Sequence, residues 1–309
     1  MTALHGVIAA AATPLRDDLS IDLDGLVEHC RYLLGDGGCD GINLLGTTGE
    51  ATSFGVDQRI AAMRAVARSG LDLRRFMVGT GTAALDDTAR LTAEAKELGF
   101  AGALVLPPFY YKGLDAAGLF AYVAALIGRV GAAGLPLYLY HFPANSGVPF
   151  TPDIVRRLRE AFPETVLGLK DSSGDLDYSA GLAAMLPGFA VFPSAEGALG
   201  RAAELGFAGC ISATANLTGP FAQAAWSGSG EARAAGLAKA VELRGLIAKF
   251  PLVASVKAAL AWSSGKAGWS RTMPPLSPLG AAEVEALAAS LVSAGLAGEA
   301  SASPARRIA

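Results

Sequence analysis

The sequence has few cysteines, no block of basic residues and no long apolar run, and each absence excludes a class of protein. Cys30, Cys39 and Cys210 are scattered and lack the spacing of metal ligands, so we expect reduced thiols in a cytoplasmic protein and no metal site. The formal net charge of −3 argues against a nucleic-acid partner. No apolar run reaches the roughly 18 residues that a membrane span needs. No lysine or arginine precedes the apolar N-terminus, so we expect neither a membrane segment nor a signal peptide.

Short apolar runs separated by helical segments are what the sequence has in abundance. Its 309 residues are 52% hydrophobic and include 38 glycines, which is typical of a folded enzyme long enough for one large domain or for two. Eight apolar runs bounded by turn residues have the length of buried strands. They are Gly6–Thr13, Gly41–Leu45, Phe76–Val78, Gly102–Leu106, Leu135–Leu139, Val166–Leu169, Phe189–Phe192 and Gly209–Ile211.

Segments with the periodicity of amphipathic helices lie between these runs. Strands alternating with helices are typical of parallel βαβ units, and eight such units close a barrel. An open doubly wound sheet would instead need a glycine-rich phosphate loop after the first strand, where this chain has Thr13-Pro14-Leu15-Arg16. The sequence therefore predicts an α/β fold, a (β/α)8 TIM barrel over residues 1–219. The predicted helices are Asp22–Leu34, Val56–Ser69, Asp86–Leu98, Ala116–Val130, Pro152–Ala161, Asp177–Met185 and Gly197–Leu205.

The C-terminal part of the chain has a different pattern. From about Pro220 to Leu296 the sequence is helical in character, with breaks at Phe250-Pro251 and Pro274-Pro275. We therefore predict a C-terminal helical extension over residues 220–296, a bundle of about three helices, followed by a flexible tail over residues 297–309.

Lys170 ends the sixth apolar run, where a charged side chain is unexpected. It is followed by Asp171-Ser172-Ser173-Gly174. One interpretation is that Lys170 begins an exposed loop or pairs with Asp171. The other is a buried lysine, because desolvation favours the neutral amine and a neutral amine can attack a ketone to form a Schiff base.

Polar and aromatic residues follow most of the predicted strands. Active sites of such barrels lie at the C-terminal ends of the strands, so these side chains are expected to meet there. Individually they could be turn, cap or rim residues. Together they supply an amine, hydroxyl groups that move protons and turn amides that bind a carboxylate, as Schiff-base chemistry requires. They are Thr47, Thr48, Tyr110, Tyr140, Lys170, Ser194, Glu196 and Ser212.

Four short motifs occur in order along the chain. They are Gly46-Thr47-Thr48-Gly49-Glu50, Tyr140-x-x-Pro143, Gly168-x-Lys170 and Gly209-x-Ile211-Ser212. In this order and spacing they resemble the dihydrodipicolinate synthase / N-acetylneuraminate lyase family of pyruvate-dependent class I aldolases. The resemblance extends from the first strand to Pro278. It implies a lyase that uses no cofactor and assembles as a homotetramer of two tight dimers.

The resemblance implies a role for each matching residue. Lys170 would form the imine with pyruvate or with the 2-oxo group of the substrate, and Tyr140 would be the general acid/base over that carbon. Thr47 would help to relay protons. Tyr110 matches a relay tyrosine that reaches into a neighbouring subunit's site. The residues of these motifs that would bind the substrate, at its carboxylate or in the pyruvate pocket, are Gly46, Thr47, Thr48, Ile211 and Ser212.

One position separates the branches of this family. Dihydrodipicolinate synthases carry an arginine two residues after the proline of the tyrosine motif, and this chain has Asn145 there. A neutral amide cannot form the bidentate clamp that arginine forms on a second carboxylate. We therefore expect an enzyme of the sugar-acid branch, acting on a small 2-oxo acid such as a 2-oxo-3-deoxy sugar acid. Asn145, Ser194 and Glu196 are suited to its hydroxyl groups, whereas Arg129, Arg156 and Arg157 are expected on helices away from the strand ends.

Two alternatives stay open at this point. The chain could be a dihydrodipicolinate synthase with a relocated carboxylate clamp, condensing pyruvate with aspartate semialdehyde. It could also be a catalytically silent barrel that regulates or binds, although the complete set of lysine, tyrosine and threonine argues against this. The sequence does not separate cleavage of a carbon–carbon bond from loss of water, because both reactions begin from the same imine.

Overall fold

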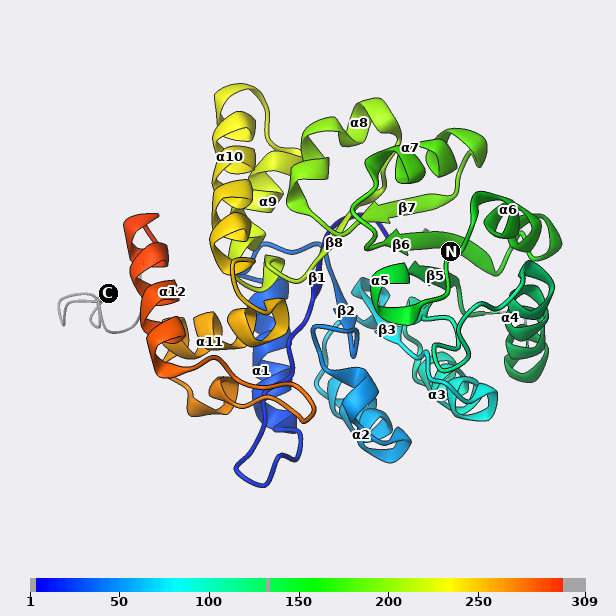
Figure 1. Cartoon of the computed structure of the whole chain (residues 1–309), viewed down its shortest axis with the longest axis horizontal. Helices are drawn as coiled ribbons and strands as arrows, with labels where there is room; N and C mark the ends of the chain where they lie inside the picture. The colour runs from blue at the N-terminus through cyan, green and yellow to red at the C-terminus, as the bar shows by residue number, and fades with distance from the viewer. Residues whose placement is uncertain (1–3, 132–133, 297–309) are drawn as a thin grey trace.

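The computed structural model describes residues 4–131 and 134–296 of the chain. The tail that we expected to be flexible, residues 297–309, lies outside the described residues. Figure 1 shows strands at the centre, helices around them, and a further group of helices, α10 to α12, on one side.

Eight parallel strands form one sheet in the order β7-β6-β5-β4-β3-β2-β1-β8. The sheet curves until its two edges approach each other, and there the backbone N–H of Ala208 donates to the carbonyl of Val191 at 3.0 Å. The predicted TIM barrel is therefore confirmed. Its strands are β1 (Gly6–Ala10), β2 (Gly41–Leu44), β3 (Phe76–Gly79), β4 (Gly102–Val105), β5 (Leu137–His141), β6 (Val166–Asp171), β7 (Ala190–Pro193) and β8 (Gly209–Ser212).

The fifth strand is displaced from its predicted position. The apolar run predicted a strand over Leu135–Leu139, but β5 begins at Leu137 and continues through Tyr140 and His141. Pro136 lacks the N–H that a strand ladder requires, so regular pairing starts after it. As a result Tyr140 belongs to the strand itself, and the sheet fixes the direction of its side chain.

The helices surround the barrel in the predicted order. Asp22 caps α1 by accepting a hydrogen bond from the backbone of Gly25, and Asp175 caps α7 in the same way. The predicted helix Gly197–Leu205 is instead a 3-10 segment, η3 (Glu196–Arg201), followed by one turn of α-helix, in keeping with the low helix propensity of its glycines. The α-helices are α1 (Leu23–Leu34), α2 (Val56–Arg68), α3 (Leu85–Leu98), α4 (Ala116–Val130), α5 (Pro143–Ser146), α6 (Pro152–Ala161), α7 (Leu176–Met185), α8 (Ala202–Leu205) and α9 (Ala215–Ser227).

Two layers of apolar side chains pack on opposite faces of the strands, as alternation along a strand requires. The outer layer lies between strands and helices. The inner layer fills the barrel and includes both Tyr138 and Tyr140 of β5. Gly168 of β6 makes room for this layer, since a Cβ there would lie 2.7 Å from the ring of Tyr138. The other members of the inner layer are Ile8, Ala10, Met77, Leu104, Ala190, Phe192 and Ile211.

The C-terminal helices cover one end of the barrel. They are α10 (Gly230–Ile247), α11 (Leu252–Ser264) and α12 (Ala281–Ser293). Their apolar faces form a second core that also includes Ala12 and Ala213, which follow β1 and β8. The extension therefore packs against the C-terminal ends of these strands, where the active site was expected.

The predicted boundary between residues 219 and 220 falls inside α9. That helix belongs with the barrel, because Asn216 near its start donates to the carbonyl of Ala10 at 2.8 Å and accepts from the backbone of Ala12. Helical sequence continues on both sides of Pro220, so the pattern alone could not show which helix packs on which unit. Among the described residues no single helix is long and apolar enough to cross a membrane; α10 and α11 meet that criterion only as a pair bent by 108°.

Candidate active site

Tyr140 and Lys170 lie side by side on adjacent strands. A bulge in β6 places Gly168, rather than Leu167, opposite Tyr138, and this register pairs Tyr140 with Lys170. Because side chains alternate between faces, this one extra residue determines which residues of β5 and β6 face each other inside the barrel. The Lys170 Nζ lies 4.6 Å from the centre of the Tyr140 ring.

The hydroxyl of Tyr140 is held by the turn after β2. Oγ1 of Thr47 lies 3.2 Å from the Tyr140 hydroxyl oxygen. Leu45 and Glu50 adopt left-handed backbone conformations, with φ of 55° and 57°, and the N–H of Glu50 donates to the carbonyl of Thr47. The segment is thus a tight turn, one of the readings that its sequence allows, and the turn also carries Thr47 to the tyrosine.

Lys170 is buried and unpaired, which excludes the interpretation as an exposed or ion-paired residue. Its side chain is only 3% exposed. Asp171 points to the other face of β6, where its carboxylate accepts from Ser179 Oγ at 2.8 Å and from the backbone of Ser173. Among the described residues, no hydrogen-bond or ion-pair partner of Lys170 Nζ is present. The amine therefore faces the interior of the barrel mouth without a counter-ion.

Lys257 of α11 is also buried but differs from Lys170 in having a counter-ion. Its ammonium group pairs with the carboxylate of Glu50, which is equally buried and also accepts from the backbone of Met273. Burial lowers the pKa of Lys257, while Glu50 opposes that change. This ion pair connects the turn after β2 to the C-terminal helices. Because the Lys257 amine is already paired with a carboxylate, it is not free to react with a carbonyl.

A cavity of about 500 Å³ lies over the amine and the tyrosine. Its walls come from the strand ends and from the C-terminal extension, which contributes Pro251 to Ala254 and Pro275 to Ser277. The cavity is therefore assembled from residues far apart in the sequence. The predicted site residues that line it are Thr47, Thr48, Tyr140, Asn145, Lys170, Ser194 and Ile211.

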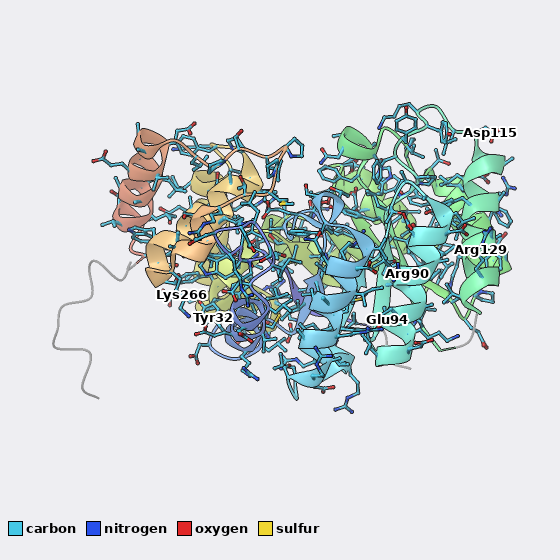
Figure 2. All side chains as sticks on the ribbon, turned by 90° about the horizontal axis from the view of Figure 1, so that it is seen from below. Tyr32, Arg90, Glu94, Asp115, Arg129 and Lys266 are labelled. Atoms are coloured by element: carbon cyan, nitrogen blue, oxygen red, sulfur yellow. The ribbon has the colours of Figure 1, made fainter. Side chains whose placement is uncertain are left out.

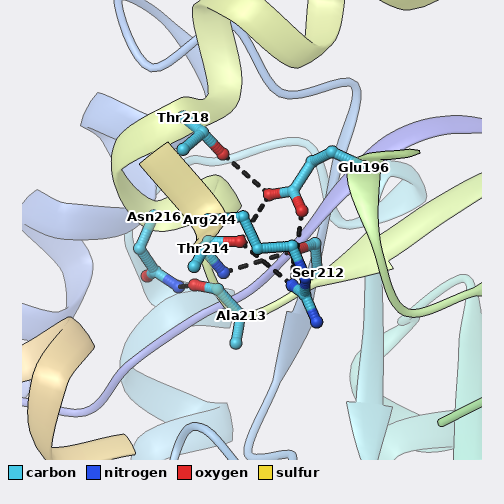
Figure 3. A network of polar contacts seen from close by, with 7 residues as sticks. All are labelled: Glu196, Ser212, Ala213, Thr214, Asn216, Thr218 and Arg244. Carbon is cyan, nitrogen blue, oxygen red and sulfur yellow. Dashed lines mark hydrogen bonds and ion pairs between the residues drawn. The ribbon is translucent and has the colours of Figure 1, made fainter. Parts of the chain in front are cut away.

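Four predicted site residues do not line this cavity. Gly46 lines a smaller cavity that shares Thr47 and Tyr140 with the larger one, and Tyr110 is 75% exposed on the loop after β4. Glu196 and Ser212 are both 0% exposed and do not line the cavity, so contact of either side chain with substrate stays a prediction. The first turn of η3 and the end of β8 direct these two side chains into a buried network below the cavity wall (Figure 3).

The buried network holds an arginine that the sequence interpretation missed. Arg244 of α10 pairs with Glu196, with its Nη1 3.3 Å from Oε2, and also donates to Ser212 Oγ and Thr214 Oγ1 (Figure 3). Its side chain reaches the cavity wall. It lies next to buried Leu243 on α10, a helix with several other charged residues, and nothing in its sequence position marks it as a site residue.

The arginines expected to lie elsewhere do so. Arg129 is on the outer face of α4 (Figure 2), and its side chain pairs with Asp86. Arg156 and Arg157 pair with acidic residues on the exposed face of α6. None of the three lines the cavity.

A metal centre has no candidate ligand set in the described part of the chain. Residues 4–131 and 134–296 contain no group of three or more His, Cys, Asp or Glu side chains that could hold a metal ion. The cysteines are buried free thiols, and burial raises the pKa of Cys30 and of Cys39 to about 12, which keeps both thiols protonated and unreactive.

Comparison with known proteins places the chain in a family. The family described as "Dihydrodipicolinate synthetase family" matches residues 3–294. An "Uncharacterized DapA-like lyase" of Chloroflexus aurantiacus is 36% identical over 288 residues, covering 92% of this chain and 95% of that one. A 4-hydroxy-tetrahydrodipicolinate synthase of Thermus thermophilus is 37% identical over 69% of each chain. The crystal structure of dihydrodipicolinate synthase from Agrobacterium tumefaciens superimposes with a TM-score of 0.86 at 30% identity, covering 94% of this chain and 99% of that chain.

The match therefore spans nearly the whole described chain, including the strand ends and the C-terminal helices that together enclose the cavity. The chain belongs to the dihydrodipicolinate synthetase family, whose members are lyases of the class I aldolase type.

Proposed function

We propose that the protein is a cytoplasmic Schiff-base lyase that acts on 2-oxo-3-deoxy sugar acids through Lys170. The observation that carries this proposal is the unpaired, buried Lys170 amine beside Tyr140, whose hydroxyl lies 3.2 Å from Thr47 Oγ1. An amine without a counter-ion in a largely apolar setting is suited to nucleophilic attack on a carbonyl. The tyrosine and threonine hydroxyls form a short path along which a proton can move.

The proposed reaction begins when the 2-oxo group condenses with the Lys170 amine and releases water. The protonated imine then withdraws electrons from the bond between the third and fourth carbons. Tyr140 removes the proton of the hydroxyl on the fourth carbon, that bond breaks, and an aldehyde leaves. The remaining enamine takes up a proton at the third carbon and is hydrolysed to pyruvate and free lysine. Loss of the fourth-carbon hydroxyl as water, after removal of a third-carbon proton, would start from the same imine.

The second candidate is 4-hydroxy-tetrahydrodipicolinate synthase, the name of several relatives that are 30% identical or more. Asn145 lines the cavity at the position where that activity would require an arginine. The other substrate of that enzyme, aspartate semialdehyde, also carries an ammonium group. Among the described residues that line the cavity there is no aspartate or glutamate that could bind this ammonium group. The sugar-acid function is therefore favoured.

Condensation of pyruvate with aspartate semialdehyde is expected to be the poorer reaction. The ammonium group of the semialdehyde has no acidic partner in the described cavity lining. A missing charge-assisted contact corresponds to roughly 1.5–3 kcal/mol, so kcat/KM for the semialdehyde should be at least about tenfold below that for the best 2-oxo-3-deoxy sugar acid. The measurement is a side-by-side comparison of both reactions, reading pyruvate release against dehydrated product for the sugar acids. A semialdehyde that is tenfold better would replace this proposal by the synthase function.

Tyr110 is expected to act in a neighbouring subunit, in a homotetramer of two tight dimers. Tyr110 and Tyr111 are highly exposed and pack edge to face on one loop, with ring centres 5.3 Å apart. Such exposed aromatic pairs are typical of interfaces. Ultracentrifugation should find at least a dimer in the active enzyme, and Tyr110→Ala should lower activity more than Tyr32→Ala, an exposed control on α1. A fully active monomer would contradict the assignment.

A further inference from the structure

Arg244 presents unused hydrogen-bond donors to the active-site cavity. The guanidinium group has five N–H donors in a planar fork. Within the described residues, all hydrogen bonds of this guanidinium group are made by Nη1, which donates to Glu196, Ser212 and Thr214. Nε and Nη2 have no protein partner there, and the side chain is 23% exposed at the cavity wall. An edge of the fork is therefore left for a ligand.

Glu196 and its neighbours hold the guanidinium group in this position. The Glu196 carboxylate is fully buried, and its Oε1 accepts from both Thr214 Oγ1 and Thr218 Oγ1, at 2.6 and 2.7 Å. Its Oε2 faces Arg244 (Figure 3). Since two threonine hydroxyls fix the carboxylate and the carboxylate holds Nη1, the orientation of the guanidinium group is set before any ligand binds. Glu196 thus acts as a positioning residue for Arg244.

The charges around the cavity favour a ligand with two negative groups. Lys170 and Arg244 are the only charged side chains in the described lining. The carboxylate beside the reacting 2-oxo group would bind near Thr47 and Thr48, and Lys170 is consumed in the imine. Arg244 comes from α10 and Thr47 from the turn after β2, so the two side chains reach the cavity from different elements. Its fork is free for a group at the other end of the substrate.

We propose that Arg244 binds a second carboxylate at the distal end of the substrate, so that the preferred substrates are 2-oxo-3-deoxy diacids. The proposal rests on the Schiff-base function assigned above and names its substrate class. A planar carboxylate can accept two parallel hydrogen bonds from the free edge of the fork, which a terminal hydroxyl cannot do.

Matched pairs of 2-oxo acids test this without knowledge of the natural substrate. The pairs are 2-oxoglutarate with 2-oxopentanoate and 2-oxoadipate with 2-oxohexanoate, which differ in a distal carboxylate. Each acid competes with pyruvate for borohydride trapping at Lys170. With the unmodified enzyme, at least one diacid should compete at least about tenfold better than its partner, as one charge-assisted contact predicts.

Variants of Arg244 identify the group responsible. Arg244→Gln should reduce that preference to about twofold or less while pyruvate alone is still trapped. Arg244→Lys keeps a cation beside Glu196 but loses the fork, and should retain only part of the preference. Arg233→Gln is the matched control, because Arg233 lies on the same helix, donates to the backbone of η3 and does not line the cavity.

The outcomes separate this proposal from the general function. Equal competition within both pairs in the unmodified enzyme overturns the role of Arg244, whether or not any variant folds. A preference that survives in a folded Arg244→Gln variant overturns it as well. If pyruvate is not trapped at Lys170 in the unmodified enzyme, the Schiff-base function fails. Calorimetric binding of 2-oxoglutarate against 2-oxopentanoate then still tests Arg244.

Discussion

Replacing Lys170 by arginine is expected to abolish turnover. The guanidinium group stays protonated and cannot attack a carbonyl, so no imine can form. In the unmodified enzyme, pyruvate followed by borohydride should add one reduced pyruvyl group, and peptide mapping should place it on Lys170. In Lys170→Arg the same treatment should add no mass. Intact-protein mass spectrometry and a pyruvate-release assay measure both results.

Two other lysines provide the controls for this experiment. Lys112 donates to the backbone carbonyls of Phe109 and Ser146, and Lys257 pairs with Glu50. Both amines are already engaged, so Lys112→Arg should retain trapping and turnover. Label on Lys112 or Lys257 would refute the assignment of Lys170. A protein that gains no mass at all would instead be the catalytically silent barrel.

Replacing Tyr140 by phenylalanine is expected to lower kcat by about 100- to 10,000-fold, the usual contribution of a general acid/base. The substitution removes only the hydroxyl that contacts Thr47 and keeps the ring beside the Lys170 amine. Because the ring remains, the cavity keeps its shape and pyruvate should still be trapped. Steady-state kinetics on a 2-oxo-3-deoxy sugar acid, together with thermal unfolding, separate a chemical defect from a folding defect.

Tyr138→Phe is the matched control for the hydroxyl. Tyr138 lies on the same strand and the same inner face, but its hydroxyl accepts from the backbone of Leu4 and it does not line the cavity. Its loss should leave kcat within about twofold of the unmodified enzyme, since only one modest hydrogen bond is removed. A Tyr140→Phe variant with near-normal kcat would show that another group moves the proton.

The sequence by itself determined the barrel and most of the residues at its mouth. Buried parallel strands appear as short apolar runs, and eight of them between helices leave few other folds. Once the strands are located, the positions of their C-terminal ends follow to within about two to four residues. The exact boundaries are the least certain feature of such patterns. Thr47, Tyr140, Lys170 and Ser194 therefore could be placed at one end of the barrel without coordinates, and all four line the cavity.

Only the tertiary structure decided which of the strand-end side chains face that cavity. A side chain reverses its direction with each residue of a strand, so a bulge in β6 or a 3-10 turn after β7 changes the outcome without changing the sequence pattern. Lys170 consequently points inward beside Tyr140, whereas Glu196 points into a buried network. Arg244 could not be found from the sequence for a related reason. It reaches the cavity from α10, and the position of that helix over the strand ends depends on apolar packing between segments far apart in the chain.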